Sequence, residues 1–222
     1  MRQFNVVVLG GTPFNNFIVF GYSSSFKSLK AGGVGKSALT VRFVRDVFVE
    51  TYDPTIEEEF RRTVLVDGRL DSVSHLLSFC GRGELKLEVL DTAGAEQFTS
   101  LNEVYIKSAR GFLLVFSLTQ EATLQEVDHL RKQIIRIKGG DTSTPMVIVA
   151  TKLDLANERE VPIHIIQSLA DQWRIPFYET SAKRNWHIED VFADLTRQMR
   201  QKYPVDPSRG EKKRTHSACT IM

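Results

Sequence analysis

Cysteine, long apolar runs and net charge are all scarce in this chain. Its 222 residues include only two cysteines, Cys80 and Cys219, which lie far apart in dissimilar contexts. A disulfide framework is therefore disfavoured, and a reducing, cytosolic compartment is the default expectation. No apolar run reaches the ~18 residues of a membrane-spanning helix, and the N-terminal run is too interrupted for a signal peptide. A net charge of +2 gives no overall footprint for nucleic acid, so we expect no such partner.

Short apolar runs alternate with amphipathic segments, which predicts one α/β domain over residues 1–203. We expect strands at 6–9, 63–66, 87–90, 112–116, 146–150 and 177–178, and helices at 36–47, 121–137, 162–173 and 188–201. This order predicts a mostly parallel six-stranded sheet with helices on both faces and ligands at the carboxyl ends of its strands. In the first helix, Leu39, Phe43 and Val47 share one face. Residues 204–222 turn to Pro, Gly, Lys and Arg, which is typical of a flexible tail.

Residues 31–37, AGGVGKS, form the core of a Walker A phosphate-binding loop. Small residues let successive backbone N–H groups wrap phosphates, Lys36 reaches the β- and γ-phosphates, and the Ser37 hydroxyl binds Mg²⁺. The helix that starts here adds its positive N-terminal end. A glycine-rich turn that happens to precede a helix is the simpler alternative.

The full Walker A pattern also needs a glycine five positions before Gly35, and Lys30 stands there. Gly10, however, ends the first predicted strand, and removal of residues 11–30 leaves VVVLGAGGVGKS, a complete strand, loop and helix start. The predicted phosphate-loop residues are therefore Gly10, Ala31, Gly32, Gly33, Val34, Gly35, Lys36, Ser37 and Ala38.

Asp91-Thr92-Ala93-Gly94 follows the strand predicted at 87–90. A carboxylate at that strand end can hold Mg²⁺ through water, and the Gly94 N–H can reach a γ-phosphate. Alone, such a tetrapeptide is more often a turn. Its place downstream of a phosphate loop favours the functional interpretation.

Two further segments can recognise a base. Thr151-Lys152-Leu153-Asp154 follows a predicted strand, and Asp154 can accept both N1–H and N2–H₂ of guanine, while the Lys152 stem packs on the base. Adenine lacks this donor pair and would leave a desolvated carboxylate unpaired. Glu179-Thr180-Ser181-Ala182-Lys183 completes the set, with the Ala182 N–H available to the base O6. Either string alone is commonly a solvated loop.

Together these segments resemble the Ras superfamily of small GTPases, in the family's order and over nearly the whole chain. TYDPTIEEEF (51–60), DTAGAEQF (91–98) and YIKSARGFLLVFS (105–117) look most like the Ras/Rap branch, and the bud-site-selection GTPases of fungi are the nearest fit. The resemblance implies the small G-protein version of the P-loop NTPase fold, and a monomer that binds GTP or GDP with Mg²⁺ and switches signalling in processes such as cell polarity. It also implies an exchange factor, a GTPase-activating protein and effectors as partners.

The resemblance assigns roles to the segment before the second predicted strand. Thr55 would close on Mg²⁺ and the γ-phosphate, which places it with Lys36 and Gly94 among the catalytic residues, and Phe48 would stack on guanine. The effector surface, whose Tyr52 also borders the nucleotide, would comprise Tyr52, Asp53, Pro54, Thr55, Ile56, Glu57, Glu58, Glu59 and Phe60.

Two positions depart from the family pattern. Thr151 stands where Asn is commoner, although the Rho branch also carries Thr there, so we expect little loss. Ala95 stands where Ras carries the glutamine that orients the attacking water. The Rap branch also lacks that glutamine and hydrolyses GTP slowly until a partner supplies the group. Gln97 lies two residues on, and nothing in the sequence shows that it substitutes.

Two stretches, 11–30 and 73–86, interrupt the family pattern in frame. Both are interpreted as unspliced introns, because possible codons at Gly11 and Lys30 provide splice-site dinucleotides, as do those at Val73 and Lys86. Genuine surface loops are the alternative. Long loops cost little closure entropy, so we expect the fold to form even with both stretches present. The first stretch, however, begins inside the predicted phosphate site, so we expect it to affect phosphate binding.

The C-terminal tetrapeptide Cys219-Thr220-Ile221-Met222 is a CaaX box, and its terminal Met favours farnesylation of Cys219. One lipid gives only marginal membrane binding, and a basic cluster at Lys212, Lys213 and Arg214 can add attraction to an anionic leaflet. We therefore expect attachment to the cytoplasmic face of the cell membrane.

The main hypothesis is a membrane-anchored GTP/GDP switch that hydrolyses GTP slowly. One alternative is a pseudo-GTPase scaffold, in which residues 11–30 disrupt the phosphate site. Another is a nucleotide-binding module without turnover, which Ala95 favours.

Overall fold

The computed structural model of the chain describes residues 2–10, 33–50, 58–65, 84–91, 103 and 106–204. In several of the strands it describes the backbone alone. The strands are β1 (Arg2–Gly10), β2 (Glu58–Leu65), β3 (Glu84–Asp91), β4 (Gly111–Ser117), β5 (Met146–Thr151) and β6 (Phe177–Glu179). The helices are α1 (Lys36–Arg45), α3 (Glu121–Ile137), α4 (Ile163–Trp173) and α5 (Ile188–Lys202), with a short 3₁₀ helix, η1 (Ala156–Glu158), after β5.

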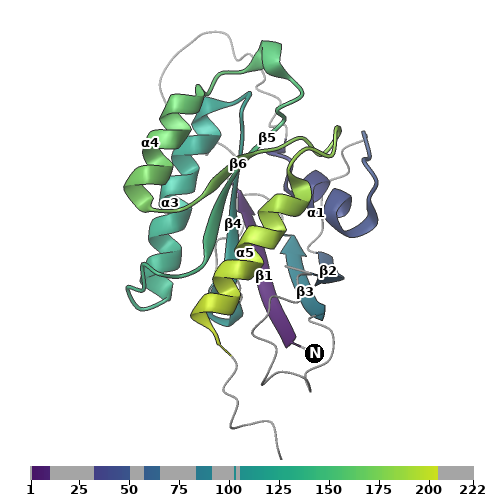
Figure 1. The fold of residues 1–222 in the computed structure, drawn as a ribbon. Helices are drawn as coiled ribbons and strands as arrows, with labels where there is room; N and C mark the ends of the chain where they lie inside the picture. Colours follow the sequence, from purple (N-terminus) through teal and green to yellow (C-terminus); the bar gives the residue numbers. More distant parts are fainter. Residues whose placement is uncertain are drawn as a thin grey trace, which may run out of the picture.

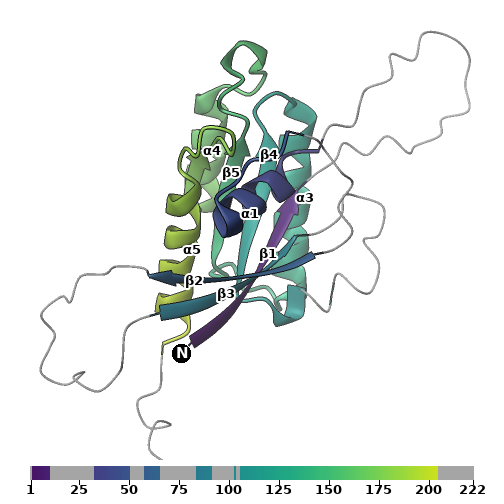
Figure 2. The ribbon, with the colours of Figure 1, turned by 90° about the vertical axis from the view of Figure 1, so that its right-hand side faces the viewer.

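These strands form one six-stranded sheet in the order β2-β3-β1-β4-β5-β6. Within the described residues, β2 pairs antiparallel with β3, and every other neighbouring pair is parallel. Figures 1 and 2 show β1 running through the middle of the sheet, with β3 and β2 on one side of it. The predicted fold class, a mostly parallel α/β sheet, is confirmed.

Helices cover both faces of the sheet, so its central strands are buried on both sides. All seven residues of β4 are buried, and they alternate between the two cores. Leu113 and Val115 pack with α1 and α5, whereas Phe112, Leu114 and Phe116 pack with α3 and α4. Figure 1 shows the same division, with α3 and α4 on one side of the sheet and α1 and α5 on the other.

Local patterns predicted several elements closely and the edges of others poorly. Helix α3 spans the predicted range, and Pro162 precedes α4 as its N-cap. Helix α1 ends at Arg45 because Asp46 adopts a left-handed conformation and closes the last turn onto the Arg42 carbonyl. Val47, predicted on the buried face of this helix, instead lies beyond it and is 46% exposed.

The third strand starts earlier than predicted. Strand β3 begins at Glu84 rather than at residue 87, so residues 84–86, predicted to lie in the second insert, belong to the sheet. Their backbone pairs with residues 63–65 of β2 and with the start of β1. The alternation of charged and apolar residues in ELKLEVL is the strand signal that marks this earlier start.

The first prediction concerns the core between α1 and α5, where the rings of Phe43 and Phe192 stack and both are fully buried. Phe192→Ala removes this contact and leaves a cavity, so the free energy of unfolding should fall by about 3–5 kcal/mol. The matched control is Ile163→Ala at the start of α4, where the side chain is 55% exposed and the change should stay within about 0.5 kcal/mol.

Denaturant unfolding followed by circular dichroism, at equal nucleotide content, measures both values. Similar losses for Phe192→Ala and Ile163→Ala would show that the α1–α5 core does not hold the domain together.

Candidate functional site

The start of α1 has the backbone geometry of an anion site. Its N-cap residue, Gly35, has a φ of 90° and so adopts the left-handed conformation that favours glycine. A helix start leaves N–H groups without intrahelical partners. Gly35 offers no side-chain cap, and the first turn of α1 contains no acidic residue that would oppose a bound anion. Phosphate binds well at such an end.

The end of β1 meets this loop directly, although 22 residues separate Gly10 from Gly33 in the sequence. A Cβ atom built on Gly10 would lie 2.7 Å from the Val115 carbonyl oxygen and 2.8 Å from Val34 Cγ2. No side chain fits in that space, so only glycine permits this approach. The structure thus brings together the two parts of the phosphate loop that the sequence separates.

Lys36 lies over the same contact. Its Cδ is 3.1 Å from the position of a Cβ on Gly10, and the residue is only 7% exposed. A buried lysine is uncommon unless a partner or ligand compensates its charge. Lys36 lies on the first turn of α1 and against Gly10, a position that suits a cation that contacts bound phosphates. Ser37 and Ala38 follow on the same turn.

Thr151, the last residue of β5, connects the phosphate loop to the sheet. Its hydroxyl oxygen lies 2.5 Å from the Val34 carbonyl oxygen and 2.9 Å from that of Phe116. It also lies beneath Gly35, since a Cβ built there would be 3.4 Å from Thr151 Oγ1. A threonine hydroxyl can donate to either carbonyl. Thr151 therefore makes a specific contact with the loop, although the family more often has Asn at this position.

The two predicted base-binding segments lie side by side. The Ser181 hydroxyl donates to Asp154 Oδ1 at 2.6 Å, and the Leu153 N–H donates to the Thr180 carbonyl at 3.0 Å. Ser181 Oγ also accepts the Arg184 N–H at 3.0 Å. Within the described residues, only Oδ1 of Asp154 takes part in a hydrogen bond, so the arrangement can present one oriented carboxylate to a base.

Lys152 is half-buried and has a φ of 64°. Desolvation by burial lowers the pKa of its ammonium group, although the negative charges of Glu158 and Asp154 act in the opposite direction. The stem of Lys152 is thus packed rather than solvated, which suits the predicted contact with the face of a base.

Residues 46–50 run beside the loop that contains Lys183. Lys183 Nζ lies 3.0 Å from Glu50 Oε1, and Asn185 Nδ2 lies 3.5 Å from Asp46 Oδ1. Phe48, predicted to stack on guanine, is half-buried between these two contacts. The contacts of Asp46 and Glu50 thus tie both ends of the segment that contains Phe48 to residues 183–185, next to the predicted base-binding residues.

Other predicted residues are described in part or not at all. Asp91 ends β3 with its backbone opposite Val8 of β1, and nothing is described of its side chain. Glu58, Glu59 and Phe60, predicted in the effector surface, begin the edge strand β2. The remaining predicted residues lie outside the described part: Ala31, Gly32, Tyr52, Asp53, Pro54, Thr55, Ile56, Glu57, Gly94 and Cys219.

The predicted Mg²⁺ ligands are Ser37, Thr55 and, through water, Asp91. Of these, only Ser37 has a described side chain, and it lies on the first turn of α1 directly after Lys36. Hydroxyl and carboxylate oxygens suit Mg²⁺. Elsewhere in the described part of the chain, no group of three or more His, Cys, Asp or Glu side chains could hold a metal ion.

Sequence reasoning missed two contacts between distant segments. Arg159 pairs with Glu179, and the Glu160 carboxylate accepts the Glu121 N–H at the start of α3. Glu179 opens one of the predicted segments, but no role was assigned to it. Each partner is twenty or more residues away along the chain, so no local spacing could have revealed either contact.

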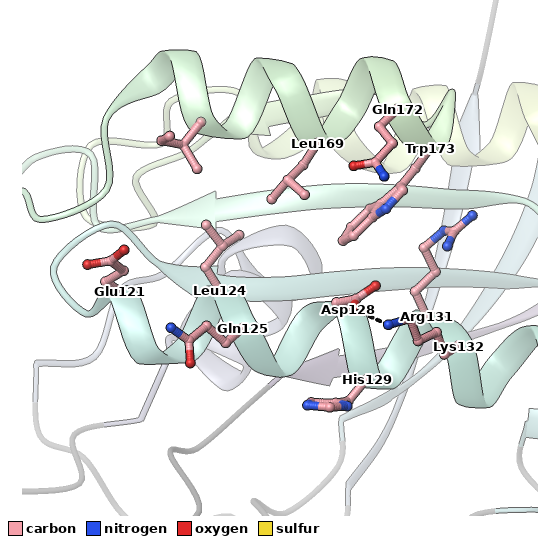
Figure 3. A pocket seen from close by; sticks show the side chains of 11 residues that line it. Glu121, Leu124, Gln125, Asp128, His129, Arg131, Lys132, Leu169, Gln172 and Trp173 are labelled. Carbon is pink, nitrogen blue, oxygen red and sulfur yellow. Dashed lines mark ion pairs between the residues drawn. The ribbon is translucent and has the colours of Figure 1, made fainter.

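A separate open groove lies between α3 and α4 (Figure 3). Leu124 and Leu169 face each other across it, and the Arg131 guanidinium lies 5.0 Å from the centre of the Trp173 ring. Its lining residues are Glu121, Leu124, Gln125, Asp128, His129, Arg131, Lys132, Ile165, Leu169, Gln172 and Trp173. None of them is a predicted nucleotide-binding residue, so this groove is distinct from the candidate site.

The sequence model of the Ras family matches residues 29–201. The match begins just before the end of the first predicted insert and therefore leaves out β1, which the structure nonetheless places in the middle of the sheet. It includes residues 31–38 of the predicted phosphate loop, but not Gly10, and both predicted base-binding segments. Since this match covers most of the sequence, the chain belongs to the Ras family of small GTPases.

Proposed function

We propose that the chain is a membrane-anchored switch that binds GTP and GDP with Mg²⁺ and hydrolyses GTP slowly. The observation that carries this proposal is the meeting of Gly10, the start of α1 and the Asp154–Ser181 pair at one end of the sheet. In the proposed complex, Lys36 contacts the β- and γ-phosphates, and Ser37 and Thr55 bind Mg²⁺. Asp91 would hold the same ion through water.

Phosphoryl transfer needs positioning and electrostatic stabilisation rather than covalent help from the protein. Lys36 and the N–H groups at the start of α1 would supply these to the phosphates, and Gly94 would add a backbone donor. Members of the family act with an exchange factor, a GTPase-activating protein and effectors. We assign the effector surface to residues 52–60, and we assign the protein to the Ras/Rap branch and to signalling in cell polarity.

Attachment to the cytoplasmic face of the cell membrane is the part of the proposal that rests on the tail. Cys219 is the proposed farnesylation site, and the basic residues 212–214 would add attraction to anionic lipid. No helix in the described part of the chain is long and apolar enough to span a bilayer.

One observation favours a second function, a pseudo-GTPase scaffold. Residues 11–30 connect the two parts of the phosphate loop, where the family has no such stretch. Titration of the full chain, including residues 11–30, with a fluorescent GDP analogue separates the two functions. A second titration of the chain lacking residues 11–30 shows whether this stretch is responsible for any loss.

A second prediction tests the base site. Asp154→Asn replaces a double acceptor by an amide and should weaken GDP binding by about tenfold or more, because hydrogen bonds to a charged group contribute about 1.5–3 kcal/mol. The same change should favour xanthosine diphosphate, whose base has a carbonyl where guanine has an amine. Asp171→Asn on α4 makes the same chemical change away from the site and serves as the control.

Competition titrations with both nucleotides, on the form that binds, measure this exchange of preference. Equal GDP affinity for Asp154→Asn and its parent would show that Asp154 does not contact the base.

A third prediction concerns the message. Spliced transcripts should lack the codons for residues 11–30, because their removal restores a complete phosphate loop from Gly10 to Ser37. The family match, which starts at residue 29, supports this expectation. Sequencing of reverse-transcribed message checks it. Transcripts that retain these codons throughout, or tryptic peptides from inside the stretch, would count decisively against it.

A fourth prediction concerns turnover. Ala95 carries no polar group to align water, so intrinsic hydrolysis should be slow even where nucleotide binds tightly. Ala95→Gln should raise the rate by about tenfold, which corresponds to about 1.4 kcal/mol of barrier. Single-turnover hydrolysis of preloaded GTP measures the change, with Gln97→Ala as the control. No gain at position 95 together with a large loss at Gln97 would assign the role to Gln97 instead.

A further inference from the structure

The two segments that form the base site come from neighbouring strands and must keep a fixed relation to each other. One follows β5 and contains Asp154, and the other follows β6 and contains Ser181. Contacts between them include the Ser181–Asp154 hydrogen bond and the Leu153–Thr180 backbone bond. Strand β6 has only three residues, so its pairing with β5 is short.

A side-chain pair, Arg159 with Glu179, also joins the two segments. The Arg159 guanidinium donates to both carboxylate oxygens of Glu179, with Nη1 3.2 Å from Oε2 and Nη2 bonded to Oε1. The third donor, Nε, bonds the Val161 carbonyl at 2.8 Å. All three nitrogen atoms of the guanidinium thus donate hydrogen bonds, which fixes the plane of the group as well as its position.

Partial burial makes this pair stronger than an exposed one. The side chains of Arg159 and Glu179 are 27% and 14% exposed, respectively. The pair on α3, Lys132–Asp128, is 66% and 35% exposed, as is typical of surface pairs that contribute little. Water and salt therefore screen the Arg159–Glu179 pair less.

The segment between Asp154 and Arg159 is short and internally bonded. It contains η1, and the N–H groups of Leu155 and Glu158 donate to the carbonyls of Lys152 and Leu155. Beyond Arg159, the N–H groups of residues 160 and 161 both donate to the Leu118 carbonyl. These hydrogen bonds restrict the backbone of the segment, so a displacement of Arg159 also displaces Asp154, five residues away.

We infer that Arg159 and Glu179 form a positioning pair that sets the aim of the Asp154 carboxylate relative to residues 181–183, and so sets selectivity for the exocyclic amine of guanine. This inference rests on the proposed guanine-nucleotide function and adds residues that do not themselves contact the nucleotide. Glu179 lies two residues before Ser181, so both partners act through short connections on the residues that do.

Selectivity responds to this pair more than overall nucleotide binding does. Asp154 must accept two parallel hydrogen bonds from one base, and such bonds weaken steeply when their angle departs from linear. The predicted phosphate loop is held by contacts of Thr151 and Gly10, in which neither Arg159 nor Glu179 takes part. Loss of the pair therefore removes mainly the amine contact and leaves the phosphate contacts in place.

The experiment compares GDP with inosine diphosphate, whose base lacks the exocyclic amine. Competition titrations on the full chain, and on the chain lacking residues 11–30, give the ratio of the two dissociation constants. Arg159→Ala should reduce the preference for GDP by about tenfold while inosine diphosphate affinity changes less than twofold. Arg159→Lys keeps the charge without the fork and should give a smaller reduction. The double variant Arg159→Ala/Glu179→Ala should match the single one, because the two residues act as a unit.

The matched control is Tyr178→Phe, next to Glu179 on β6. It removes the hydrogen bond from the Tyr178 hydroxyl to Asp194 on α5, so it perturbs the same strand without touching either base segment. Thermal unfolding of each variant reports the structural cost. The control should leave the GDP preference unchanged even where it lowers the melting temperature.

The outcomes distinguish a failure of the positioning role from a failure of the proposed function. A parent that prefers GDP, together with an Arg159→Ala variant that keeps the same preference, overturns the positioning role and leaves the proposed function intact. Equal losses for both nucleotides, or a loss in Tyr178→Phe that matches Arg159→Ala, would show a merely structural role and also overturn it. If Arg159→Ala does not fold, Arg159→Lys carries the test. Absence of nucleotide binding in both forms of the parent overturns the proposed function and this inference with it.

Discussion

The close approach of β1 to the phosphate loop is the constraint on which the candidate site depends. Gly10 leaves no room for a side chain between Val34 and the Val115 carbonyl, so the start of α1 is set directly on the carboxyl end of the central strand. Lys36 lies over this contact and is buried with it. A side chain at Gly10 would push the loop away from the sheet and move every donor at the start of α1 together.

Strand β5 carries the same constraint to the other half of the site. Thr151 contacts the loop through the Val34 carbonyl, and Asp154, three residues later, belongs to the base-binding pair. One strand end thus positions both the residues expected to hold phosphate and those expected to select the base. This shared origin explains why contacts far from either ligand position, such as Arg159 with Glu179, bear on the geometry of the site.

The stretch 11–30 is compatible with the fold of the sheet, but it interrupts the loop that is predicted to bind phosphate. Closing a loop of this length costs little more entropy than closing a shorter one, and β1 pairs with β3 and β4 in full register despite it. The family match starts at residue 29, whereas the sheet includes β1 from residue 2. Tertiary pairing therefore recovers a strand that the continuous family pattern does not reach.

The sequence by itself determined the α/β class, the range of α3 and the place of β5, and it predicted the residues of the phosphate and base segments, because these depend on local periodicity and on short motifs. The tertiary structure alone decided that β3 starts at Glu84, that Val47 lies outside the α1 core, and that Gly10 meets Val34. It also decided the pairing of Arg159 with Glu179. These features join residues that are distant along the chain or depend on a backbone turn, and no local pattern encodes which distant partner a residue will meet once the sheet has formed.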